Sequence, residues 1–195
     1  IIKKDGLPPV PPVQKKELLA PSVKSVKSAA QKSGTEVKIT VNPVANADFY
    51  TVYRKISGKV TVIGTTKTGI LKDKKPVSGK RAFYYASASS ENTENYADSK
   101  TGGQKSITLA ADTKKVTVKS LKKAVKVTFQ KVKKAKGYLI YRYAKKKGPY
   151  VQLTKKPVKK LAYVDKKVKA KKTYYYKVVT YGSGKTYSAG KTTKK

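Results

Sequence analysis

The stretch VKVTFQKVKKAKGYLIYR, residues 125–142, repeats a pattern found 88 positions earlier as VKITVNPVANADFYTVYR, residues 37–54. Eight of the 18 aligned positions are identical. At the start of each stretch, apolar residues alternate with polar ones, which is the period-two pattern of a half-buried strand. The two stretches therefore predict the same strand-rich unit twice in one chain.

The repetition continues on the C-terminal side of both stretches. Leu71-Lys72-Asp73 corresponds to Tyr163-Val164-Asp165, and residues 77–87 correspond to residues 168–178. Helical apolar spacing is absent, and Gly, Asn, Ser and Lys-Lys punctuate the chain every 8–12 residues. This pattern favours two copies of an antiparallel β-sandwich of about 85–90 residues each.

Three segments follow from these boundaries. Residues 1–20 form a Pro-rich linker or leader, because LPPVPPV at residues 7–13 favours a semi-rigid polyproline II spacer. Residues 21–108 form the first module, and residues 112–195 form a second, highly basic module. Because the chain begins at Ile1 without a long apolar region, we expect it to be a mature form or an excised piece of a longer protein.

The second copy resembles a fibronectin type III domain of the kind found in secreted and surface proteins of Gram-positive bacteria. Four pieces carry the resemblance in order: GYLIYR at 137–142, GPY at 148–150, YVD at 163–165 and TYYYKV at 173–178. Through the repeat, it covers nearly all of residues 21–195. The fold class that it implies is all-β, with two tandem fibronectin type III-like (immunoglobulin-like) β-sandwiches after the Pro-rich N-terminal segment.

The resemblance also implies two structural residues. Tyr174 matches the tyrosine-corner position, where the hydroxyl bonds back to the backbone at a strand crossing. In the first copy the matching residue is Phe83, so we expect no corner bond there. Family members are found outside the cell, which implies a secreted or cell-surface location.

Positive charge is the strongest surface feature of the sequence, with a formal net charge of +37. Residues 111–195 hold 28 basic and 2 acidic residues, whereas residues 21–110 hold 15 and 6. The candidate polyanion-binding residues are the clustered lysines of the second module. They are Lys131, Lys133, Lys134, Lys145, Lys146, Lys147, Lys155, Lys156, Lys159, Lys160, Lys166, Lys167, Lys171 and Lys172.

Two interpretations of these lysines stay open. They attract an anionic cell-envelope polymer or an acidic glycan, or they form a solvated face that keeps the module soluble. Nonspecific nucleic-acid binding at low salt follows from the charge, but no recognition helix or RNA-binding signature is present. Tyr143, Tyr150 and Tyr187 are candidates for stacking on sugar rings, and the alternative, which the sequence favours, is that they belong to the core or are scattered over the surface.

Several classes of function are excluded by composition. The chain has no Cys and no His, so thiol nucleophiles, imidazole bases and the usual zinc ligand sets are absent. No apolar stretch approaches the roughly 18 residues of a transmembrane segment. The second module contains only Asp112 and Asp165 as acids, and we expect Asp165 to cap a turn. We therefore predict no enzyme and no cofactor.

The sequence thus predicts non-catalytic spacer and interaction modules, joined to other domains of a larger bacterial surface or secreted protein. The second module would attach electrostatically to anionic envelope polymers. The alternative is an adhesion module that binds carbohydrate or host matrix.

Overall fold

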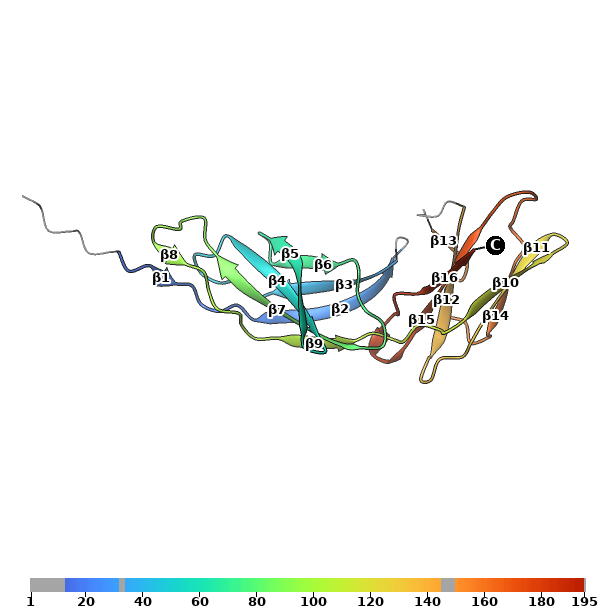
Figure 1. Ribbon diagram of the computed structural model, residues 1–195, viewed down its shortest axis with the longest axis horizontal. Helices are drawn as coiled ribbons and strands as arrows, with labels where there is room; N and C mark the ends of the chain where they lie inside the picture. Colours follow the sequence, from blue (N-terminus) through green and yellow to red (C-terminus); the bar gives the residue numbers. More distant parts are fainter. Residues whose placement is uncertain (1–12, 32–33, 145–149, 195) are drawn as a thin grey trace, which may run out of the picture.

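The computed structural model describes residues 13–31, 34–144 and 150–194, and its two β-sandwiches follow one another along the long axis of the molecule (Figure 1). Most of the predicted polyproline stretch, and the predicted lysines Lys145, Lys146 and Lys147, lie outside the described residues. In the described part, regular structure consists of strands and one short 3-10 turn, η1 (Ser183–Lys185). The all-β prediction is confirmed.

The first sandwich packs a three-stranded sheet, in the order β2-β3-β6, against a four-stranded sheet, in the order β5-β4-β7-β9. A short parallel pair, β1 with β8, lies at its far end (Figure 1). The strands are β1 (Lys16–Glu17), β2 (Val23–Gln31), β3 (Gly34–Val41), β4 (Phe49–Ile56), β5 (Lys59–Thr66), β6 (Ile70–Asp73), β7 (Arg81–Ser89), β8 (Tyr96–Ala97) and β9 (Lys105–Thr108).

The second sandwich has the same arrangement, with sheets in the orders β10-β11-β14 and β13-β12-β15-β16. Within the described residues, the strand pairs of this sandwich are antiparallel. The strands are β10 (Val116–Leu121), β11 (Ala124–Phe129), β12 (Gly137–Tyr143), β13 (Val151–Gln152), β14 (Ala162–Asp165), β15 (Tyr175–Tyr181) and β16 (Lys191–Lys194). Each sandwich thus has seven strands in two packed sheets, which is the arrangement that the fibronectin type III resemblance implies.

The alternation read from the sequence places the core between the sheets. Val37 and Ile39 on β3 are fully buried while Lys38 between them is exposed, and Val127 is fully buried on β11. On β15, Tyr176 enters the second core. Successive strand residues point to opposite faces, so burial of alternate apolar side chains holds each strand in register.

Both ends of the connection between the sandwiches are anchored. Leu109 is buried in the first core, and Thr113 in the second sandwich donates its hydroxyl to the Gln130 carbonyl over 2.8 Å. Leu18, which lies inside the segment interpreted as a leader, also packs in the first core. The end of that segment is therefore part of the first sandwich.

The predicted match of Phe83 with Tyr174 is wrong by one position. Arg54 pairs with Tyr84 across β4 and β7, as Arg142 pairs with Tyr176 across β12 and β15. The counterpart of Tyr174 is consequently Ala82, and Phe83 corresponds to Tyr175. Alanine has no hydroxyl, so the first sandwich still cannot form a corner bond at this position.

Candidate anion-binding site

A lysine-lined hollow lies between the β10–β11 turn and the loop that joins β14 to β15. Both segments lie at the end of the second sandwich that points away from the first (Figure 1). The β10–β11 turn and the loop between β14 and β15 enclose about 440 Å³ there. We call this feature the lysine hollow. Its basic residues, all exposed, are Lys122, Lys123, Lys166, Lys169, Lys171 and Lys172. No acidic residue is among the described residues that line it, so the local potential has a single sign.

The loop that carries four of these lysines is held in place at both ends. At its start, the Lys167 N–H donates to Asp165 Oδ1 over 3.0 Å, which closes a tight turn. Near its end, the Lys169 N–H donates to the Tyr174 hydroxyl over 2.9 Å, and the Tyr174 ring is buried. The lysines therefore project from a backbone whose course is fixed by the fold.

Arg142 joins this loop to the sheet beneath it. Its guanidinium lies 2.9 Å from Asp165 Oδ2, donates to the Lys167 carbonyl, and sits 5.1 Å from the centroid of the Tyr174 ring. The Tyr176 hydroxyl donates to Asp165 Oδ2 over 3.1 Å. Burial, with the neighbouring Asp165 charge, raises the pKa of Tyr176. The carboxylate of Asp165 is thus fully engaged inside the protein.

The first sandwich contains the same cluster. Arg54 pairs with Asp73, which also accepts the Tyr84 hydroxyl over 2.8 Å and the Lys75 N–H over 2.9 Å. Burial is also the main reason that the pKa of Tyr84 is raised. Because the cluster recurs at equivalent positions and is engaged internally, it stabilises the corner of each sandwich and offers no free acid for catalysis.

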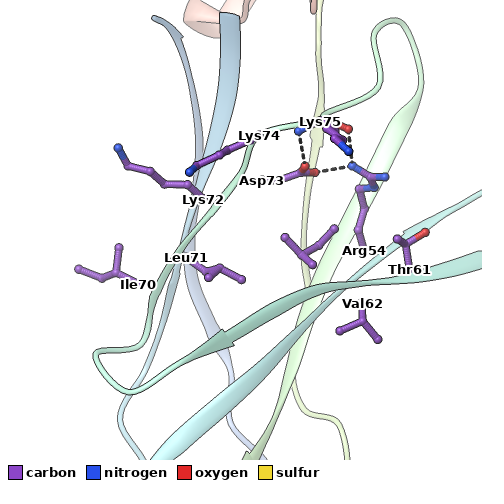
Figure 2. A pocket seen from close by; sticks show the side chains of 10 residues that line it. Arg54, Thr61, Val62, Ile70, Leu71, Lys72, Asp73, Lys74 and Lys75 are labelled. Atoms are coloured by element: carbon purple, nitrogen blue, oxygen red, sulfur yellow. Dashed lines mark hydrogen bonds and ion pairs between the residues drawn. The ribbon is translucent and has the colours of Figure 1, made fainter. Parts of the chain in front are cut away.

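A second groove, of about 670 Å³, lies beside this cluster in the first sandwich (Figure 2). Ile70 and Lys72 come from β6 on one side, and Thr61 and Val62 come from β5 on the other. The lysines here do not form a field of one sign, because Asp73 is among the lining residues and Lys72 pairs with Glu36 at 2.9 Å. The lysine hollow is the stronger candidate for binding anions.

The structure divides the predicted lysines between different places. Lys166, Lys171 and Lys172 line the lysine hollow, and Lys167 is exposed in the same loop. The others in the described residues are exposed at the opposite end or along the edge, in the β11–β12 and β13–β14 loops. They are Lys131, Lys133, Lys134, Lys155, Lys156, Lys159 and Lys160.

Lys131 and Lys159 line a hollow of their own, of about 610 Å³, together with Lys136 and Tyr138. The predicted residues therefore do not form one patch. Lys122 and Lys123 were not predicted, although they are the two residues of a turn between alternating segments. The available sequence signal was a polar pair between two segments of alternating residues, which is typical of a two-residue hairpin turn. In the structure, Leu121 pairs with Ala124 across this turn.

The tyrosines considered for sugar stacking pack against one another. Tyr143 is only 3% exposed, with its ring centroid 4.5 Å from that of Tyr150 and 5.1 Å from that of Tyr175. Tyr187 lies 5.2 Å from Tyr181. The buried face of Tyr143 is not available to a sugar ring, so that candidate is wrong.

Two solved structures of fibronectin type III segments are similar to this chain at low sequence identity. No protein-family model and no curated protein matches the chain. Among solved structures, it is similar to a two fibronectin type-III domain segment from chicken tenascin, at 14% identity and a TM-score of 0.41, over 89% of this chain and 98% of that one. It is also similar to the FN1-FN3 domains of chicken CNTN1, at 20% identity and a TM-score of 0.36, over 90% of this chain and 66% of that one.

Proposed function

We propose that this chain supplies non-catalytic spacer and interaction modules to a larger bacterial secreted or surface protein. In this proposal the modules divide between residues 108 and 112, and the second attaches electrostatically to an anionic envelope polymer through the lysine hollow. Sandwiches of this architecture occur widely in cell-surface proteins. Among the described residues, no helix is long and apolar enough to cross a membrane.

The observation that carries the proposal is the uneven distribution of acidic residues, because exposed lysines occur on both sandwiches whereas the exposed acids of the described residues do not. Six lysines surround the hollow at one end. The exposed acidic residues of the described part all lie at the other end, around β1 and β8 (Figure 1). They are Glu17, Asp48, Glu91, Glu94 and Asp98. A polyanion is therefore attracted most strongly to the end that holds the lysine hollow, because lysines within a Debye length of it, about 8 Å at physiological salt, are screened least.

Lysine, unlike arginine, acts here as a point charge without a bidentate preference, so the expected ligand class is broad. Phosphodiester polymers such as polyglycerol phosphate and sulfated glycans both satisfy it. Nucleic acid satisfies it at low salt, which makes DNA a useful measure of nonspecific attraction.

The test is the binding of the full chain to polyglycerol phosphate, heparin and a neutral glucan, across a salt series. The variant Lys122→Gln/Lys123→Gln/Lys166→Gln/Lys172→Gln neutralises four hollow lysines. The matched control, Lys114→Gln/Lys115→Gln/Lys119→Gln/Lys126→Gln, removes the same charge from exposed positions of the same sandwich.

We expect the hollow variant to reduce the slope of log affinity against log salt by about 3, because each of the four lost contacts to a flexible polyanion contributes about 0.7 to that slope. The control should change the slope much less. Equal losses in both variants would mean that charge acts without a site. Retention of the glucan at high salt would favour the carbohydrate-binding alternative.

A further inference from the structure

We infer that the paired residues Ala30 and Thr35 of the β2–β3 hairpin dock on the second sandwich and make the two modules one rigid unit. We call residues Ala30 and Thr35 of this hairpin the docking pair. The surface that receives it, the receiving face, consists of Leu139, Tyr141 and Val179 on the outer side of the four-stranded sheet. This inference does not depend on polyanion binding.

Direct contacts join the two surfaces. The Thr35 hydroxyl donates to the Ser188 carbonyl over 2.5 Å, and Thr35 and Ser188 are 4% and 0% exposed. Ala30 packs against the receiving face. Next to this contact, the Ala189 N–H donates to the Ser78 hydroxyl oxygen over 2.6 Å. Hydrogen bonds and apolar packing thus meet at one interface.

One cross-strand pair of the receiving face is apolar in the second sandwich and polar at the equivalent positions of the first. Leu139 pairs with Val179 across β12 and β15, and both are nearly completely buried. The equivalent cross-strand pair in the first sandwich is Thr51 with Ser87, which is polar and half-buried. The pair is therefore apolar where a neighbouring module buries it and polar where, within the described residues, no module covers it, as the cost of burying polar groups requires.

The hairpin differs in the same way. In the first sandwich, β2 and β3 continue to the pairs Ala30–Thr35 and Gln31–Gly34, whereas β10 and β11 end at the equivalent of the pair before them, Leu121–Ala124. The additional residues include both members of the docking pair. Only the first module has the longer hairpin, and only the second has the apolar face that receives it.

The connecting segment supports a fixed arrangement as well. Asp112 Oδ1 accepts the Gly190 N–H over 2.7 Å, and Leu109 and Thr113 on either side are buried. Relative motion is the default for two domains that share a small polar interface. Here the apolar pair and the anchored connection oppose that motion.

The experiment measures the distance distribution between spin labels on the two sandwiches by electron paramagnetic resonance. The chain has no native cysteine, so Lys59→Cys and Lys119→Cys, both exposed, give two unique labels. The test variant, Leu139→Thr/Val179→Ser, transfers the polar pair of the first sandwich to the second. The matched control, Thr51→Leu/Ser87→Val, makes the reverse exchange in the first.

We expect a single narrow distribution in the parent chain and in the control, and a distribution widened about twofold or more in the test variant. Ala30→Glu, which places a charge in the contact from the hairpin side, should widen the distance distribution equally. This second variant replaces the first in the test if the first does not fold. Circular dichroism verifies that each variant stays folded. A broad parent distribution, or folded variants from both sides that remain narrow, would overturn the inference.

Discussion

Replacing Asp165 with Asn is the most informative change to the fold, because one buried carboxylate holds three elements together. Its side chain is 1% exposed and lies 2.9 Å from the Arg142 guanidinium. It also accepts the Tyr176 hydroxyl over 3.1 Å and the Lys167 N–H over 3.0 Å. The substitution keeps the size of the side chain and removes its charge.

The cost follows from what remains. Removing one partner of a buried ion pair costs about 3–5 kcal/mol, because the other charge stays without compensation. The Arg142 side chain is 15% exposed, so water reaches part of the guanidinium. Asn can also still accept the Lys167 N–H. We therefore expect the lower end, about 3 kcal/mol, which is a large fraction of a typical domain stability of about 5–15 kcal/mol.

Urea unfolding of the full chain, followed by circular dichroism, measures this loss. Arg142→Met and the double variant complete a cycle, and the coupling between the two residues should exceed about 1 kcal/mol. Asp98→Asn, an exposed acid, serves as the control and should change stability by less than about 0.5 kcal/mol. A loss below about 1 kcal/mol for Asp165→Asn, or additive single variants, would refute the reasoning.

Three further changes test other features. Tyr141→Phe removes a buried hydroxyl that has no hydrogen-bond partner in the described residues, so at neutral pH it should cost less than about 0.5 kcal/mol in urea unfolding. Burial raises the pKa of Tyr141 to about 12, so its stabilising contribution is present below pH 10 and is lost as the pH rises toward 12. Between pH 8 and pH 11, the free energy of unfolding of Tyr141→Phe should therefore rise by about 1 kcal/mol relative to that of the parent chain. Tyr174→Phe should lower stability by about 1 kcal/mol by removing the acceptor of the Lys169 N–H, and an unchanged urea midpoint would contradict this. Gly102→Ala should lower the free energy of unfolding of the first sandwich by about 3 kcal/mol or more, because the new Cβ would lie 1.7 Å from the Pro21 carbonyl oxygen. A melting temperature equal to that of the parent chain would contradict this prediction.

The strands were predictable because their burial is local. On β3, β4 and β11, buried residues alternate with exposed or half-buried ones, and that alternation is visible in the sequence. On β12, residues 137–141 are all buried, because both faces of this strand are covered. The one-position error at Phe83 has a physical cause. Val77 resembles Val168 by residue type, but Pro76 occupies the equivalent position and is buried, whereas Val77 is 36% exposed. Residue type therefore pairs Val77 with Val168, whereas burial pairs Pro76 with Val168 and gives the register that the strands have.

The candidate site was only partly predictable, because distant segments build it. Lys123 and Lys166 lie far apart in sequence and line the same hollow only after β11 pairs with β14. Charge runs identify exposed lysines, but they do not show which runs share one end of a sandwich. The internal partners of Asp165 also depend on pairing across sheets. Two of the chain's three arginines, Arg54 and Arg142, recur at equivalent positions, and this recurrence was the available signal.

The unequal hairpins have a consequence for how such a pair can be rearranged by recombination. Two interchangeable cassettes could be duplicated, deleted or reordered with little penalty. Here a reversed order would place the short β10–β11 hairpin beside the polar Thr51–Ser87 pair, and would expose Leu139 and Val179 to water. The two modules are therefore expected to be inherited and transplanted together, in this order, as a single building block of about twice the usual length.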